Sequence, residues 1–148
     1  MKNKLLPPTY LLIAILTMIG LHFFLPLGRV MPVPWNLVGL VPVLLGIVIN
    51  VFADKALHLA GTTVKPFLES TALVTQGVYS LSRHPIYLGF VLVLVGVAAL
   101  LGSLSPWLVV PVFILWMEIV FIRVEERMLE EKFGEDWLVY KKKVRRWI

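Results

Sequence analysis

The stretch Ile86–Gly102, IYLGFVLVLVGVAALLG, decides the fold, together with the run Pro106–Ile122, PWLVVPVFILWMEIVFI, that follows it. At a rise of about 1.5 Å per residue, a helix of either run reaches close to the roughly 30 Å of a bilayer's hydrocarbon layer. Backbone groups in lipid must be satisfied within their own segment, so both runs are predicted to be helices. Only Ser103, Leu104 and Ser105 join them, which predicts a tight antiparallel hairpin.

Two further apolar runs, Thr9–Leu27 and Trp35–Ala53, predict two more spans, with Pro42 kinking the second. The chain of 148 residues is 59% apolar and 16% charged, outside the range of ordinary soluble domains. Residues 1–148 are therefore predicted to form one all-α integral membrane domain of about four transmembrane helices. Because the chain has no cysteine, disulfides, thiol nucleophiles and cysteine-ligated zinc are excluded.

The positions of the basic residues predict how the chain is oriented in the membrane and that membrane lipids are its partner. Of the 14 Lys and Arg residues, the predicted loop Gly28–Pro34 contains Arg29 alone. The other 13 lie on the opposite side: Lys2, Lys4, Lys55, Lys65, Arg83 and the cluster from Arg123 to Arg146. The positive-inside rule then places both termini and the loop 54–83 in the cytoplasm, which makes this a cytoplasmic-membrane protein if it is prokaryotic. A net charge of +5 beside apolar runs is typical of contact with anionic lipids rather than nucleic acid.

The last apolar run is predicted to continue into the cytoplasm as a helix up to Phe133, where Gly134 ends it. A second short helix is expected after Gly134, with lysines 141–143 in its last turn, where they complement the helix dipole. Trp137, Tyr140 and Trp147 among these lysines predict that the second helix lies at the membrane surface.

Three features could carry chemistry. Arg83 and His84 come just before the third helix, where free N–H groups, the helix dipole and a guanidinium suit a carboxylate or phosphate, although Arg83 could merely reach lipid headgroups. The hairpin is expected to bring Glu125 and Glu126 beside this turn, either as a salt-bridge network or as one pole of a pocket for a zwitterion. Glu118 lies inside the apolar run, and an intramembrane carboxylate is a functional hypothesis unless water at the interface reaches it.

Two motifs resemble a known family. They are the run LVTQGVY at 73–79 leading to RHPIYLG at 83–89, and the later Glu125-Glu126 with Leu129, Phe133-Gly134, Tyr140 and the terminal VRRWI at 144–148. Together they resemble the isoprenylcysteine carboxyl methyltransferase family and, more loosely, the phospholipid N-methyltransferases, over roughly residues 62–148. The resemblance implies S-adenosylmethionine as methyl donor, bound at the cytoplasmic mouth without a Rossmann fold. The absence of a Gly-rich nucleotide loop from the sequence agrees with this.

The resemblance also implies roles for residues. The backbone of Leu73 and Val74 would meet the adenine, with Tyr79 close by. The cofactor would be lined by His84, Pro85, Ile86 and Tyr87, with Glu125 at its polar end and Glu126 beside it. Arg83 suits the methionine carboxylate on the physical argument given above. No metal is expected.

One departure concerns the methyl acceptor, which is expected to be a small lipophilic molecule that enters from the bilayer. Where the prenylcysteine enzymes have a substrate-facing arginine, this chain has Phe121, and Arg123 is displaced by two residues onto another helix face. Glu118 lies about one turn before Phe121. This predicts a neutral or basic acceptor, such as an amine or thiol, whose proton Glu118 accepts. A carboxylate acceptor would instead need only a positioning cation such as Arg123.

Two other classes of function stay open at this point. One is an NADPH-dependent membrane reductase of the sterol reductase type, although its larger cofactor would need more basic contacts than the loop 54–83 offers. The other is a membrane subunit without catalytic activity, in which Arg83 and Glu125 only form an ion pair. Cofactor binding distinguishes the three classes.

Overall fold

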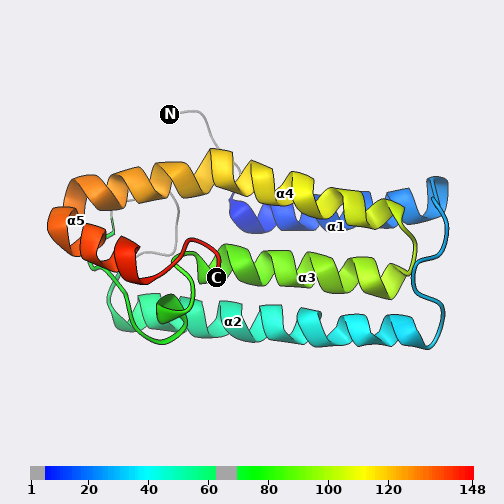
Figure 1. Ribbon diagram of the computed structural model, residues 1–148, viewed down its shortest axis with the longest axis horizontal. Helices are drawn as coiled ribbons and strands as arrows, with labels where there is room; N and C mark the ends of the chain where they lie inside the picture. Colours follow the sequence, from blue (N-terminus) through cyan, green and yellow to red (C-terminus); the bar gives the residue numbers. More distant parts are fainter. Residues whose placement is uncertain (1–5, 63–69) are drawn as a thin grey trace. The chain divides into compact units, whose positions relative to one another are not determined.

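The computed structural model describes residues 6–62 and 70–148, and within these ranges the chain is helical, with no strand (Figure 1). The α-helices are α1 (Pro7–Phe24), α2 (Leu40–Leu59), α3 (Pro85–Leu101), α4 (Val109–Met117) and α5 (Arg123–Lys143). Shorter elements are the 3-10 helices η1 (Trp35–Gly39), η2 (Gly77–Ser80) and η3 (Ser105–Leu108), and the π-helix η4 (Glu118–Ile122). Lys2, Lys4 and Lys65, used above for orientation, lie outside the described residues.

The predicted all-α membrane fold is confirmed. Among the described residues, three helical stretches are long and apolar enough to cross a membrane: Pro7–Phe24, Trp35–Leu59 and Ser105–Lys143. The 17 apolar residues of α3 extend for roughly 26 Å. The apolar side chains on the outer faces are exposed, as expected where lipid is the solvent. Pro42 lies near the start of α2, within the helical stretch Trp35–Leu59, and the kink expected there stays a prediction.

The contacts divide into two compact units, Met1–Ile47 with Phe90–Leu115, and Val48–Gly89 with Trp116–Ile148. In the first unit, Gly39 and Gly96 approach so closely that a Cβ on either would overlap the other's carbonyl oxygen. Such close helix packing is typical of small residues between apolar helices. His22 Nδ1 lies 2.8 Å from the hydroxyl of Ser103 and ties the end of α1 to the turn after α3.

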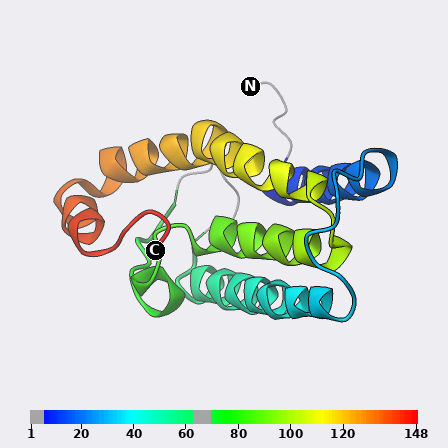
Figure 2. The same cartoon turned by 45° about the vertical axis from the view of Figure 1, so that its right-hand side comes forward.

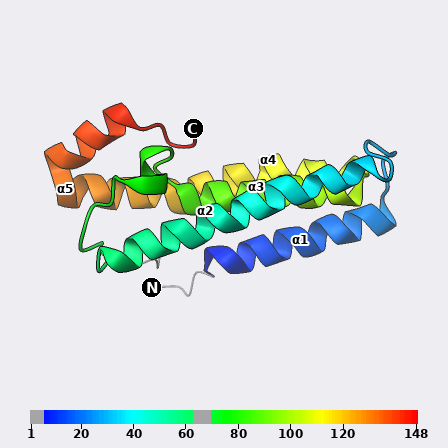
Figure 3. The same ribbon diagram turned by 90° about the horizontal axis from the view of Figure 1, so that it is seen from below.

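In the second unit, α5 doubles back on itself at Gly134, as Figure 1 shows. The φ of 48° and ψ of −116° at Gly134 end the first half of the helix there, as predicted. Figure 2 shows the tail after α5 returning toward the start of α3, and in Figure 3 η2 lies beside the second half of α5. The hydroxyl of Tyr140 donates a hydrogen bond of 2.6 Å to the carbonyl of Tyr79, which fixes this contact.

The aromatic side chains of the second half of α5 point inward. Trp137 is only 1% exposed, and Tyr140 is also buried. Their rings therefore do not face the membrane, and a position of this helix at the membrane surface stays a prediction. Because α5 folds back on its own unit, these rings form the core beneath the turn before α3.

The apolar helix α4 runs into the π-helix η4 and then into α5 without a break. A π-turn pairs residues five apart, and it is frequent at functional sites. Here it brings Arg123 Nη2 within 3.5 Å of Glu118 Oε1. In an uninterrupted α-helix, residues five apart lie on different faces, so the sequence alone does not predict this contact.

Candidate functional site

The turn that leads into α3 is held by hydrogen bonds on both sides. The hydroxyl of Ser82 accepts a hydrogen bond from the backbone N–H of His84 and donates one to the carbonyl of Arg146, each 3.1 Å long. The backbone N–H of Arg83 donates to the carbonyl of Arg145, also at 3.1 Å. The tail after α5 therefore fixes the position of Arg83 and His84.

Glu126 is the centre of the ionic contacts at this turn. It is buried, and its Oε1 lies 2.9 Å from Arg83 Nη2 and 3.3 Å from His84 Nε2. Arg146 adds a fork, with Nη2 donating to Oε2 at 2.6 Å and Nε donating to Oε1 at 3.1 Å. The predicted approach of the acid pair to Arg83 and His84 is confirmed, and both oxygens of Glu126 are occupied by protein groups.

Glu125 is more open than Glu126. Its side chain is 22% exposed, against 7% for Glu126. The hydroxyl of Tyr87 donates to its Oε1 at 2.5 Å, and His84 Nδ1 lies 3.5 Å from its Oε2. One oxygen of Glu125 thus has only a long contact and can accept a further hydrogen bond.

Both ring nitrogens of His84 face carboxylates, and this sets its protonation. Burial works against a charge on His84, but its hydrogen bonds to Glu125 and Glu126 outweigh burial and raise its pKa above 6.5. Burial also works against the charge on Glu126, but hydrogen bonds from His84 and Arg146 hold its pKa well below the usual range. The site therefore favours an imidazolium between two carboxylates. Burial raises the pKa of the Tyr79 hydroxyl, which stays protonated.

Arg83 is engaged by protein groups, and its role at the methionine carboxylate stays a prediction. Its Nη1 donates to the carbonyl of Lys141 at 3.1 Å, Nη2 contacts Glu126, and its Cζ lies 5.7 Å from the ring centroid of Trp137. The guanidinium is thus buried among protein groups rather than held out to a ligand at the start of α3. The second half of α5 supplies two of these partners, and its return could not be oriented from sequence. In the described part of the chain, Nε of Arg83 and Nε1 of Trp137 are buried without a partner.

Glu118 and Phe121, which lie about one turn apart in the sequence, have different neighbours. Glu118 Oε1 lies 3.0 Å from Arg146 Nη1 and 3.5 Å from Arg123 Nη2. Phe121 is fully buried, with its ring centroid 6.2 Å from that of Tyr87. The π-turn accounts for the difference, because it shifts the register of the helix between the two residues.

Arg146 is the site residue that sequence reasoning missed. It donates hydrogen bonds to both Glu118 and Glu126. In the sequence, its only signal was its place in the motif at 144–148. Leu73 and Val74 lie in the non-helical segment before η2, half-buried, and their backbone role at the adenine stays a prediction. Pro85 and Ile86 form the first turn of α3 directly after His84.

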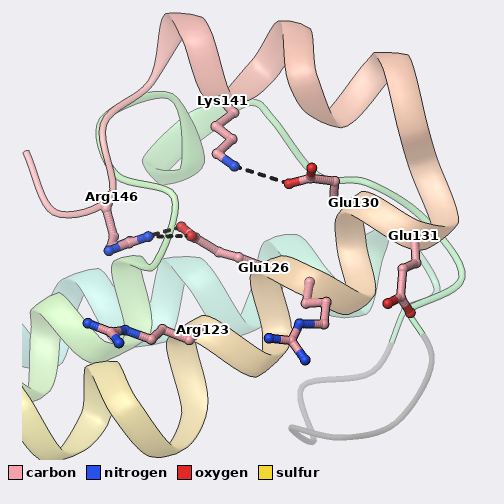
Figure 4. Close-up of a pocket in the computed structure, with 7 residues that line it drawn as sticks. Arg123, Glu126, Glu130, Glu131, Lys141 and Arg146 are labelled. Carbon is pink, nitrogen blue, oxygen red and sulfur yellow. Dashed lines mark hydrogen bonds and ion pairs between the residues drawn. The ribbon is translucent and has the colours of Figure 1, made fainter.

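A polar cavity of about 570 Å³ adjoins Glu126 (Figure 4). Its lining residues are all charged: Arg123, Glu126, Arg127, Glu130, Glu131, Lys141 and Arg146. They come from both halves of α5 and from the tail. Within residues 6–62 and 70–148, no group of three or more His, Cys, Asp or Glu residues could hold a metal ion.

Comparison with known proteins identifies the family. The family model described as phospholipid methyltransferase matches residues 35–136. A protein-S-isoprenylcysteine O-methyltransferase of Saccharomyces cerevisiae is 46% identical over 96 residues, which are 60% of this chain and 39% of that protein. The enzyme of the same name from Xenopus laevis is 34% identical over 116 residues, or 74% of this chain and 38% of that protein.

A solved structure shares the fold. It is a eukaryotic intramembrane Ras methyltransferase, an isoprenylcysteine carboxyl methyltransferase, with a TM-score of 0.68 and 25% identity. The match covers 95% of this chain and 52% of that one. The chain thus spans less than half the length of its two curated relatives. The chain belongs to the phospholipid methyltransferase family, and it is similar to the isoprenylcysteine carboxyl methyltransferases in motifs and fold.

Proposed function

We propose that this protein is an S-adenosylmethionine-dependent membrane methyltransferase that acts on a small lipophilic acceptor entering from the bilayer. The observation that carries the proposal is the partly exposed carboxylate of Glu125 at the start of α3. It lies between the hydroxyl of Tyr87 and the imidazole of His84. The names of the relatives from yeast and frog support methyl transfer. S-adenosylmethionine supplies an electrophilic methyl group when bound.

The residues present fit this cofactor. Glu125 retains an oxygen that can accept a hydrogen bond from an ammonium or hydroxyl group. The first N–H group of α3, on Ile86, has no acceptor within the helix, and the positive end of the helix lies there. With the imidazolium of His84 they suit the methionine carboxylate, in place of the engaged Arg83. The backbone of Leu73 and Val74 remains available for the adenine.

The protein's part in methyl transfer is to position the acceptor and to exclude water, because the attack on a sulfonium methyl needs little covalent chemistry from side chains. An amine or thiol acceptor would also lose a proton, and Glu118 was expected to accept it. Its contacts with Arg146 and Arg123 suit it better to holding those cations. A lipophilic carboxylate is already ionised at neutral pH and needs no proton acceptor, so this acceptor class fits best.

Isothermal calorimetry of the purified protein tests the cofactor. S-adenosylhomocysteine is expected to bind, and NADPH is not. Binding of NADPH alone would point to the reductase class. If the protein unfolds cooperatively on heating and binds neither S-adenosylhomocysteine nor NADPH, the result would favour a membrane subunit without catalytic activity.

Methylation of a panel of lipophilic acceptors tests the acceptor class. A base-labile methyl ester on a prenylcysteine carboxylate is expected, and Glu118→Gln is expected to retain most of the turnover. If Glu118 accepted a proton in the reaction, its replacement would lower turnover by about 10²–10⁴-fold. That loss, together with a base-stable methyl product on an amine or thiol, would instead support the acceptor class predicted from the sequence, with Glu118 as proton acceptor.

We also propose that both termini are cytoplasmic, from the bias of the basic residues. A cysteine at the exposed Lys142 is expected to resist an impermeant thiol reagent in intact cells, and one at the exposed Arg29 is expected to react. Labelling at position 142 and not at position 29 would reverse the topology.

A further inference from the structure

The cavity beside Glu126 contains more positive charge than its own acids neutralise. Figure 4 shows two internal pairs that cross it, Glu126 with Arg146, and Glu130 with Lys141 at 3.1 Å. Arg83 and His84 compensate Glu126 further. These acids are therefore occupied, and the arginines on the first half of α5 determine what else the cavity can bind.

Two arginines in the lining are free to bind a ligand. The side chain of Arg123 is 64% exposed, and its one ion pair is the 3.5 Å contact with Glu118, an oxygen that Arg146 also holds. Arg127 is exposed and has no carboxylate within 4 Å in the described part of the chain. The two lie four residues apart, so their side chains project from neighbouring turns on one face of α5. Two guanidinium forks at this spacing suit a phosphate, which offers several oxygens to both.

Exposed apolar residues precede these arginines in the helix, and they indicate which kind of molecule the phosphate belongs to. Ile119 lies four residues before Arg123 and is 60% exposed, and Trp116 lies three residues earlier and is 48% exposed. Exposed apolar side chains thus precede the exposed arginines along the same helix, which changes from apolar to cationic just after Ile122, where the apolar run ends. A phospholipid has the same order, with acyl chain first and phosphate next, and its phosphate lies at the depth where a span leaves the hydrocarbon.

We propose that this cavity binds the phosphate of an anionic phospholipid, whose acyl chain lies along Trp116 and Ile119. A free phosphate offers the same oxygens but leaves the apolar part of the surface unused. The one unpaired acid of the lining, Glu131, is labelled in Figure 4 at the far side of the cavity from Arg123 and Arg146. The lipid site goes beyond methyl transfer, since it requires neither cofactor nor acceptor.

Native mass spectrometry of the detergent-solubilised protein tests the site by titration with phosphatidylglycerol, phosphatidylcholine or inorganic phosphate. Phosphatidylglycerol is expected to bind most tightly, and inorganic phosphate at millimolar concentration is not expected to displace it. The double variant Arg123→Gln with Arg127→Gln is expected to weaken phosphatidylglycerol binding at least about tenfold, from the loss of two charge-assisted contacts.

The matched control is Lys142→Gln with Lys143→Gln. It removes the same charge from exposed residues of the second half of α5, outside the cavity lining. This control is expected to keep most of the affinity. Equal losses in the two double variants would overturn the proposal in favour of general attraction to a basic surface, and displacement of the lipid by phosphate would identify a site for a soluble anion.

A conservative pair covers the case in which the glutamine variant does not fold. Arg123→Lys with Arg127→Lys keeps the charge and removes the forks, so an intermediate loss of affinity is expected. Unchanged affinity in this pair would show that no fork contacts the phosphate and would also overturn the site. Lipid binding needs no cofactor, so its failure would leave the calorimetric test of the proposed function untouched.

Discussion

Replacing Glu126 by alanine is expected to lower the free energy of unfolding by about 3–5 kcal/mol, the range for breaking a buried ion pair from one side. The substitution leaves Arg83, His84 and Arg146 without the carboxylate that they share. Arg83 and His84 are themselves buried, so water cannot replace the lost partner. No other single carboxylate in the described part of the chain contacts three cationic side chains.

Reversible unfolding in mixed micelles measures this loss, and Glu130→Ala is the matched control. Glu130 also lies on α5 and forms one ion pair within the described ranges, but both members of that pair are exposed, so its loss is expected to cost about 1 kcal/mol or less. Equal effects of the two substitutions would contradict the central place of Glu126 in the site.

The same cluster predicts how stability depends on pH. The pKa of His84 is raised in the folded state, so its contribution is fully present below about 6.5 and is lost as pH rises through the folded value. The pKa of Glu126 is lowered, so its contribution is present above the unfolded value and is lost as pH falls through the folded one. Stability from this cluster is therefore greatest between the two unfolded values. His84→Gln is expected to remove the alkaline part of the dependence.

Glu125→Gln and His84→Ala are each expected to weaken binding of S-adenosylhomocysteine by about 1–3 kcal/mol, the worth of one charge-assisted hydrogen bond. Glu125→Gln tests this best, because glutamine keeps the shape and can still accept the hydrogen bond from Tyr87. The loss would then come from the missing charge and not from a rearranged site. Calorimetry measures both affinities.

The control for these variants is Glu131→Gln, which removes an exposed acid that has no ion pair in the described ranges. It is expected to bind like wild type. If Glu125→Gln and His84→Ala also bind like wild type, the motif is only structural in this protein. Thermal unfolding of each variant must be checked in parallel, since His84 also contacts Glu126.

Much of the fold could be predicted because its signals are local. Four long apolar runs require helices in lipid, and Gly134 ends the first half of α5 whatever surrounds it. The meeting of Glu125 and Glu126 with the turn at His84 also followed from the short connection between two helices. Each of these inferences needed only chain length, composition and helix geometry.

The rest depended on contacts that composition does not encode. Trp137 lies against Arg83, and the carbonyl of Lys141 accepts a hydrogen bond from Arg83, because α5 turns back in one particular direction after Gly134. The sequence does not determine that direction. Arg146 enters the site only because the tail pairs with the turn at Arg83. Aromatic residues among lysines look alike in sequence whether they face lipid or a small core, so the burial of Trp137 and Tyr140 could not be predicted.

The π-turn at Glu118–Ile122 also bears on how relatives should be compared. One residue more or less in a helix rotates everything after it by about 100°. A π-turn, however, holds one residue more than an α-turn, so a relative that lacks one residue in this stretch can form a regular α-helix and still keep its acid pair on the same side. A gap of one residue between Met117 and Glu125 is therefore compatible with the same arrangement of Glu125 and Glu126, and proteins that differ in length there can share this site.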